Sequence, residues 1–354
     1  MNRSCSAIDM GAKIQERLNL LRNVEKPRHI YKCICFAITR KCPLECRRCF
    51  FCGSKDGESI DIADARTIIA NLPDDLEVIA ITGGEPFANV GLLFDVLREI
   101  KNRDFRELSQ IDILTTGIWA TDRKYVRETI KKVIDLGVNM FAVGAFDKWH
   151  YEAGLKKELP ELLVKTLKED FGAIEPNFKQ NKNNEEILRE VYSHNLYVRP
   201  MANNTAILAG RAMWAVKGDE KGILIQPNFS FMCRGFLETL YGYTYYVNFN
   251  GELHFCANFS ARPLGNLKDE PFNFILSRSK NDEFLQMIHE GDMMAFAEKY
   301  FGMSEEYVKR ELEDWGTCGF CTKLFTKYFK DRDDKPIMHK IYEIERDRYK
   351  KESS

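Results

Sequence analysis

The sequence lacks the features that direct a chain into a membrane or out of the cell. No stretch approaches the ~18 consecutive apolar residues of a membrane-spanning helix. The N-terminus has no apolar core followed by a small-residue cleavage site, and there is no lipidation motif. We therefore expect a cytoplasmic protein, in a compartment that keeps thiols reduced.

An excess of charge of one sign is also missing. Lys and Arg number 52 and Asp and Glu 53, so the formal net charge is −1 at pH 7. This balance gives no electrostatic reason to expect binding to nucleic acid or to an anionic membrane. The hydrophobic content of 44% is ordinary for a globular protein, and a length of 354 residues suits a barrel with an appendage.

Cysteine, by contrast, occurs eleven times and is clustered. In a reducing compartment this points to metal binding or catalysis rather than to disulfides. Cys42, Cys46 and Cys49 have the spacing C-x3-C-x2-C. Three thiolates can hold three corners of a cubane iron–sulfur cluster and leave one iron open for a substrate or cofactor. Structural zinc is the alternative, although zinc prefers four ligands in two knuckles or a Cys/His mixture.

Short apolar runs alternate with helical patterns from residue 30 to about residue 227. The expected strands are Tyr31–Ile38, Glu77–Thr82, Ile111–Thr115, Met140–Ala145, Leu196–Met201 and Gly222–Gln226. The expected helices are Ile62–Leu72, Gly91–Arg103, Asp122–Leu136, Pro160–Phe171 and Glu185–His194. This alternation predicts an α/β fold, a partial (β/α)6 TIM-like barrel with parallel strands. Its chemistry is expected at the C-terminal ends of the strands, where the cysteine triplet follows the first strand.

The remaining third has a different pattern. An Asn-Gly turn at residues 250–251 predicts a β-hairpin of Tyr245–Phe249 and Glu252–Cys256. Helices are expected at Asp282–His289, Met293–Phe301 and Ser304–Glu313, followed by a Cys-Gly-Phe-Cys knuckle. A charged helix, Asp334–Lys351, is expected last, and its alternating charges indicate a solvated face. We expect an N-terminal extension (1–29), the barrel (30–227), a C-terminal domain (228–330) and the charged helix (331–354).

The second expected strand ends in Gly83, Gly84, Glu85 and Pro86. Glycines let backbone approach a ligand closely, and a carboxylate follows at the strand end. Together with the C-x3-C-x2-C loop, this turn resembles the radical S-adenosylmethionine (SAM) superfamily. The resemblance implies a [4Fe–4S] cluster with one open iron on the cysteine triplet, and SAM as cofactor. In that family the turn receives the amino group of SAM, which assigns this role to all four residues of the turn.

The resemblance suggests further SAM or substrate contacts at the ends of later strands: Thr116, Asp147 and Arg199. Arg199 would suit the methionine carboxylate, because Arg pairs with carboxylates in a bidentate manner. The alternative is that these are polar residues of the barrel rim. Where the family has an aromatic residue near adenine, this chain has Arg48, whose guanidinium could stack instead.

The later cysteines Cys233, Cys256, Cys318 and Cys321 resemble the auxiliary-cluster domains of this superfamily, called SPASM when long and twitch when short. Four thiolates would hold one [4Fe–4S] or [2Fe–2S] cluster. The short form fits better, because no cysteine follows the final pair. A zinc knuckle remains the alternative for this set.

The family resemblance implies reductive cleavage of SAM to a 5′-deoxyadenosyl radical that takes a hydrogen atom from a substrate carbon. The pattern is closest to members that modify ribosomally made peptides, the epimerase branch in particular. That branch places a cysteine after the auxiliary ligand, where this chain has Ala257. Alternatives are a sugar or cyclitol dehydrogenase or epimerase, and a non-catalytic Fe–S or zinc protein. An electron donor such as flavodoxin or ferredoxin is the implied partner.

Overall fold

The computed structural model describes residues 32–175, 196–201, 211–215, 243–257, 259, 261–279, 281–283 and 293–352. These residues belong to one compact unit that runs from Tyr31 to Ser354. The expected strand Gly222–Gln226, the expected helix Glu185–His194, most of Asp282–His289 and the ligand candidate Cys233 lie outside the described residues. Within the described ranges, no helix combines the length and apolar character needed to cross a membrane.

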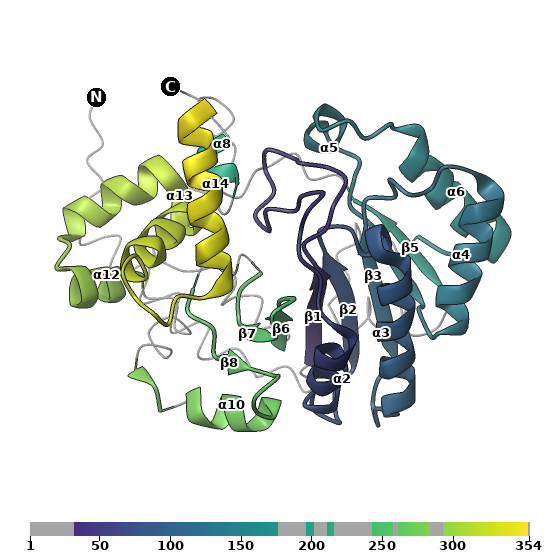
Figure 1. Cartoon of the computed structure of the whole chain (residues 1–354), viewed down its shortest axis with the longest axis horizontal. Coiled ribbons are helices and arrows are strands. Elements are labelled where there is room, and N and C mark those ends of the chain that lie inside the picture. The colour runs from purple at the N-terminus through teal and green to yellow at the C-terminus, as the bar shows by residue number, and fades with distance from the viewer. Residues whose placement is uncertain are drawn as a thin grey trace, which may run out of the picture. The chain divides into compact units, whose positions relative to one another are not determined.

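A central sheet of parallel strands confirms the predicted α/β class (Figure 1). Its first five strands are β1 (Lys32–Thr39), β2 (Val78–Gly83), β3 (Gln110–Thr115), β4 (Met140–Val143) and β5 (Tyr197–Pro200). They pair with one another in chain order, and every pairing is parallel. The sheet is not closed, because β5 ends its order at one edge and β8 at the other. The fold is therefore the partial barrel that the repeating pattern predicts.

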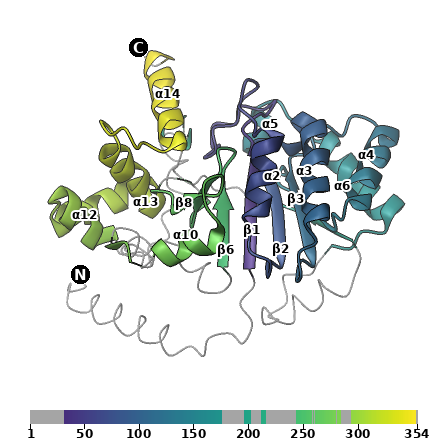
Figure 2. The same cartoon turned by 60° about the horizontal axis from the view of Figure 1, so that its bottom comes forward.

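One face of this sheet is covered by helices, as Figures 1 and 2 show. The helices are α2 (Ile62–Ala70), α3 (Val90–Arg103), α4 (Arg123–Asp135) and α6 (Glu158–Phe171). Side chains alternate along a strand, so Ile111 and Ile113 of β3 enter the core beneath the helices. Asp112, between them, is on the opposite face, which we call the inner face of the sheet. Asp61 and Asp122 cap the N-termini of α2 and α4 with their side chains.

The C-terminal hairpin forms as the Asn-Gly turn predicts, and it extends the same sheet. Strand β6 (Tyr243–Val247) pairs antiparallel with β7 (Glu252–His254), and β7 pairs with β8 (Gly265–Asn266). Strand β6 also pairs with β1 in parallel, from Lys32 opposite Tyr243 onward. The hairpin thus lies against the strand that leads into the cysteine triplet, an arrangement that the local pattern does not predict.

The C-terminal helices are α10 (Phe272–Ser279), α12 (Met293–Phe301), α13 (Glu305–Tyr328) and α14 (Ile337–Glu352). Helix α13 is bent at Gly316, whose φ of 66° and ψ of 172° are not helical. Helix α14, for which a solvated charged face is expected, also buries one face. Met338, Ile341 and Tyr342 pack into the main core.

Candidate functional site

The cysteine triplet lies in the segment between β1 and α2, residues 40–61, which we call the cysteine loop. The backbone amide of Cys42 donates to Ser54 O at 2.8 Å, which ties the two sides of the loop together. The amide of Cys49 donates to Cys46 O at 3.1 Å, so these two cysteines share one turn. In Figure 1 the loop rises from the C-terminal end of β1, the edge where parallel barrels place their chemistry.

The thiols are enclosed by apolar side chains. Cys42 and Cys46 are buried, and they form a cluster with Leu44, Ala145 and Leu155. Cys49 is half-buried and packs against the same cluster. Burial, with a contribution from the Cys49 thiol, raises the pKa of Cys46 to about 12. Burial also raises the pKa of Cys42, so these thiols favour the protonated form unless a cation binds them.

The donors of this loop are of the kind that an iron–sulfur cluster binds. A cubane cluster binds each of its thiolates on a separate iron. Three thiols from one loop in an apolar surrounding fit that soft donor set.

The Gly-Gly-Glu-Pro turn at the end of β2 contacts the cysteine loop through its backbone. The amide of Gly84 donates to Thr39 O at 2.7 Å, and the amide of Glu85 donates to Lys41 O at 2.9 Å. A Cβ on Gly83 would lie 2.2 Å from Thr39 O, and one on Gly84 would lie 2.5 Å from Lys41 O. The two glycines are therefore required for this close approach, whatever else they bind.

The Glu85 side chain points into the protein and accepts four hydrogen bonds. Thr115 Oγ1 donates to Oε1 at 2.8 Å, and Thr116 donates to Oε2 through both its amide and its hydroxyl. The fourth donor is the amide of Phe87, at 3.1 Å. Burial raises the pKa of Glu85, although these hydrogen bonds oppose the shift. Glu85 and Thr116, both predicted SAM contacts, thus join the ends of β2 and β3 to each other.

Asp147 caps α5 (Lys148–Glu152) and lies next to the cysteine loop. Its carboxylate accepts from Arg48 Nη2 at 2.7 Å and contacts His150 Nδ1 at 2.9 Å. Burial raises the pKa of Asp147, but the hydrogen bond and charge of His150 and the charge of Arg48 outweigh it, and the net shift is downward. Arg48, for which stacking on adenine was one expectation, is here paired with a carboxylate.

Arg199 lies on the inner face of the sheet. It is on β5, opposite Ala142 of β4, and it is exposed. Its charge acts on Asp112 of β3, which shares that face. The inner face also carries Cys33 and Cys35, whose side chains are half-buried.

The described auxiliary candidates lie in the C-terminal helical region. Cys318 and Cys321 are both helical residues of α13, beyond the bend at Gly316, so their spacing of three places them on one helix face. Cys256, just after β7, and Cys321 pack against the same apolar cluster. The expected knuckle is thus part of a helix, and Cys233 lies outside the described residues.

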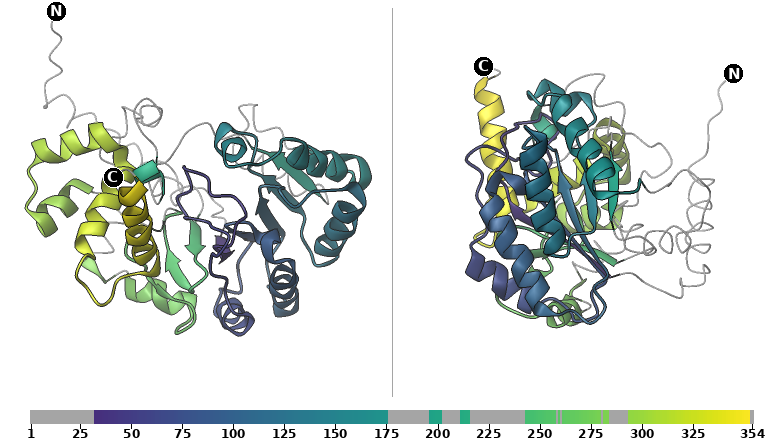
Figure 3. Two further views of the ribbon diagram at one scale, coloured as in Figure 1. Left: turned by 45° about the horizontal axis from the view of Figure 1, so that its top comes forward. Right: turned by 90° about the vertical axis from the view of Figure 1, so that its right-hand side faces the viewer.

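Sequence reasoning missed a buried ion pair at the cysteine loop. Arg211, just before α8 (Ala212–Ala215), pairs with Glu345 of α14 at 3.0 Å. The left view of Figure 3 shows α8 beside the loop. Glu345 lies in a helix of alternating charges. Its spacing of three and four from Tyr342 and Ile341, two apolar residues of the same helix, is the signal that could have indicated an inward side chain.

The cysteine loop and the Gly-Gly-Glu-Pro turn lie within a match to a known protein family. Residues 36–146 match the family described as the Radical SAM superfamily. No curated protein matches the chain. Among solved structures, BtrN, in complex with AdoMet and 2-DOIA, is 16% identical, with 74% of this chain and 89% of BtrN covered and a TM-score of 0.44.

Two further structures were crystallised with peptides. For anSMEcpe with bound AdoMet and a peptide, identity is 13%, coverage 89% of this chain and 99% of that chain, and the TM-score 0.45. For Streptococcus suis SuiB bound to the precursor peptide SuiA, identity is 14%, coverage 81% and 73%, and the TM-score 0.37. The family match spans the cysteine loop, the Gly-Gly-Glu-Pro turn and strands β2 to β4, so it is this part of the chain that is similar to the radical SAM superfamily.

Proposed function

We propose that this protein is a radical SAM enzyme that reductively cleaves SAM and uses the 5′-deoxyadenosyl radical to remove a hydrogen atom from a substrate carbon. The observation that carries this proposal is the backbone contact between the cysteine loop and the Gly-Gly-Glu-Pro turn, through Gly84 to Thr39 and Glu85 to Lys41. It joins the cluster-ligand candidates to the turn that the family uses for SAM.

The residues of the site have distinct proposed roles. Cys42, Cys46 and Cys49 would hold a [4Fe–4S] cluster, which when bound supplies the electron for SAM cleavage. The amides of Gly84 and Glu85 are already donated to the loop. These two amides are therefore not available to SAM, and the carbonyl oxygens of the turn are acceptors of the kind that an ammonium group needs. The apolar cluster around the thiols would keep water away from the reacting atoms.

We assign a ribosomally made peptide as the substrate class on the basis of marks shared with peptide-modifying members. These marks are Cys52, Thr116 to Trp119, Asp147 with His150, and Cys318 to Cys321. Trp119 stacks on Phe87, with ring centroids 4.1 Å apart, directly after the Gly-Gly-Glu-Pro turn. Two of these marks thus adjoin the candidate residues: Trp119 through Phe87, and Asp147 through its ion pair with Arg48 of the cysteine loop.

A small polar substrate, such as a sugar or cyclitol, is the second candidate. The observation in its favour is a pair of charged side chains on the inner face, Asp112 of β3 and Arg199 of β5. A carboxylate and a guanidinium can together bind hydroxyl groups. Stimulation of 5′-deoxyadenosine formation by sugars or cyclitols, and not by peptides, would favour this candidate.

Anaerobic reconstitution tests the function. Iron and sulfide are counted, then dithionite and SAM are added and 5′-deoxyadenosine is measured. We expect about eight iron per chain for two cubane clusters, or about six if the auxiliary site is [2Fe–2S]. Replacing Cys42, Cys46 and Cys49 by Ala should abolish cleavage, whereas replacing Cys318 and Cys321 should lower iron content alone. Zinc in place of iron, without cleavage of SAM, would refute the proposal.

A further inference from the structure

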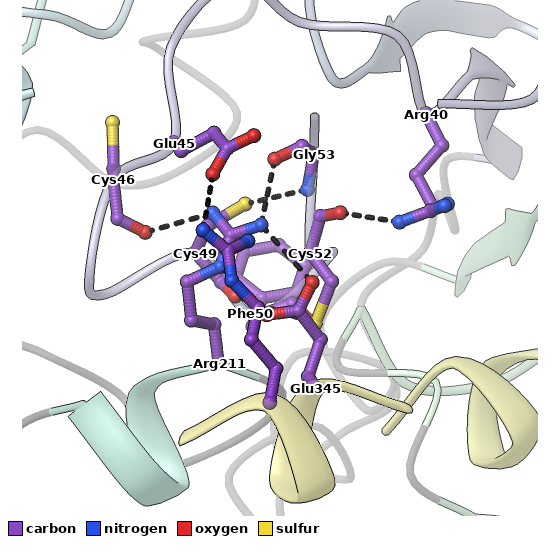
Figure 4. Close-up of polar contacts among 10 residues, drawn as sticks. Arg40, Glu45, Cys46, Cys49, Phe50, Cys52, Gly53, Arg211 and Glu345 are labelled. Carbon is purple, nitrogen blue, oxygen red and sulfur yellow. Dashed lines mark hydrogen bonds and ion pairs between the residues drawn. The ribbon is translucent and has the colours of Figure 1, made fainter. Parts of the chain in front are cut away.

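Arg211 is a fully buried cation that touches the cysteine loop at three points. Its backbone amide donates to Cys49 O at 3.1 Å. Its guanidinium donates from Nη1 to Cys46 O at 3.2 Å and from Nη2 to Gly53 O at 2.9 Å (Figure 4). One residue therefore holds the carbonyl groups of two of the three candidate cluster ligands.

The remaining side of the guanidinium faces Glu345 of α14. Nε donates to Oε2 at 3.0 Å and Nη2 to Oε1 at 3.3 Å, which is the fork geometry of a bidentate pair. Glu345 is itself only 6% exposed. A buried guanidinium without a partner is strongly unfavourable, so Glu345 is what permits Arg211 to lie here.

A second ion pair, which is exposed, joins α14 directly to the cysteine loop. Arg348 of α14 pairs with Glu45 of the cysteine loop at 3.0 Å, with 46% and 36% of the side chains exposed. An exposed pair contributes little to stability because water and salt screen it. It is therefore the natural control for the buried pair.

We propose that Arg211 and Glu345 are positioning residues for the first cluster. Glu345 orients and neutralises Arg211, and Arg211 holds the carbonyls of Cys46, Cys49 and Gly53 in the shape that binds the cluster. The effect on the cluster rests on the proposed function, whereas the effect on the shape of the cysteine loop does not depend on it. Net charge near a cluster helps to set its reduction potential. Loss of the Glu345 charge would leave Arg211 uncompensated beside the cluster and favour its reduced form.

The electrostatic part is tested with Glu345→Gln, which keeps the size and one acceptor of the side chain. We expect near-normal iron content and a midpoint potential, from potentiometric titration monitored by EPR, that moves to a more positive value. Arg348→Met should leave the potential unchanged. An unchanged potential in Glu345→Gln would overturn this part of the proposal.

The positioning part is tested without iron, by hydrogen exchange of residues 42–54 in the apo-protein. Arg211→Lys keeps the positive charge but loses the planar set of N–H donors that binds the loop carbonyls. Because the loop would then open locally more often, we expect exchange in this segment to be about tenfold faster or more. Arg348→Met should exchange like the wild type. Equal protection in Arg211→Lys and the wild type would overturn this part.

A double variant separates positioning from general stability. Replacing a buried ion pair by apolar residues of similar size often restores stability, so Arg211→Met with Glu345→Met should unfold near the wild-type urea concentration. The loop carbonyls would still lack their donor, so we expect fast exchange and poor iron loading. Protection and loading equal to the wild type would refute the proposal. A wild type that binds no iron would refute the proposed function instead, while the exchange result would still decide the role of Arg211.

Discussion

Glu85 and Thr116 are joined by two hydrogen bonds to the same carboxylate oxygen, at 2.6 Å from the hydroxyl and 2.7 Å from the amide of Thr116. Thr115 and Phe87 donate to the other oxygen, so this fully buried carboxylate accepts four hydrogen bonds from the protein. This carboxylate fixes the ends of two neighbouring strands. Its link to SAM would then be indirect, through the position of the glycine turn.

Glu85→Gln should destabilise the protein by about 1–3 kcal/mol, because the new amide group would face donors and leave buried partners unsatisfied. Urea unfolding of the apo-protein measures this loss. Glu99→Gln is the control, since Glu99 pairs with Arg66 at the surface and its loss should cost less than about 0.5 kcal/mol. Equal unfolding midpoints for the two variants would contradict the role assigned to Glu85.

Gly84→Ala should separate the glycine turn from the cysteine loop, because the added Cβ would lie 2.5 Å from Lys41 O. We expect SAM cleavage to fall at least about tenfold, since the reacting groups depend on their mutual position. Gly91→Ala, in α3, is the matched control, because its Cβ would meet nothing closer than 3.9 Å. Retained cleavage in Gly84→Ala would show that the close approach is dispensable.

Asp147→Asn should cost about 3 kcal/mol, because Arg48 would lose the counter-charge of a fully buried carboxylate. The Asn side chain can still cap α5, so the loss reports the ion pair rather than the cap. Lys131→Gln breaks an exposed pair with Asp135 and should change the free energy of unfolding by less than about 0.5 kcal/mol. Similar losses in both variants would argue against the buried pair.

Asp112 should make stability depend on pH. Burial raises its pKa to about 7, with the Gln110 hydrogen bond and the Arg199 charge opposing the shift. Between about pH 4, the ordinary value of Asp, and pH 7, the folded protein holds a proton that the unfolded chain has released. Stability from this group is therefore greatest below pH 4 and is lost as the pH rises through 7, by at most about 4 kcal/mol.

Urea unfolding from pH 4.5 to pH 8 checks this sign. The free energy of unfolding of the wild type, taken relative to that of Asp112→Asn, should fall steadily as the pH rises to 7 and stay constant above it. If the free energies of unfolding of the two proteins changed with pH in parallel throughout, Asp112 of the folded protein would be ionised from pH 4.5 to pH 8.

Local patterns predicted the strands and the cysteine loop because each is encoded in a few neighbouring residues. The apolar run before the triplet forms β1, and the run before Gly83 forms β2. The pairing of β1 with β6 could not be predicted in this way, since it depends on which distant strand meets a free edge. The continuation of α13 past Gly316 was not predicted either, because one glycine is compatible with either a continued or a broken helix.

The candidate site was likewise predictable only where its residues are neighbours in the sequence. The spacing of Cys42, Cys46 and Cys49 indicated the cluster, because ligand number and spacing are chemical constraints on a short segment. The inward orientation of Glu85 and the pairing of Arg48 with Asp147 arise from contacts across the fold. Side-chain partners of this kind have no signature in the one-dimensional pattern.

The parallel pairing of β1 with β6 has a consequence for synthesis of the chain. Lys32 of β1 leaves the ribosome long before Tyr243, its partner in β6. Until then, the β1 edge that carries the cysteine loop lacks this neighbour, and an unpaired strand edge is a template for association with other chains. We expect nascent chains that end before β6 to aggregate or to need a chaperone, and the edge to be covered only when the hairpin has emerged.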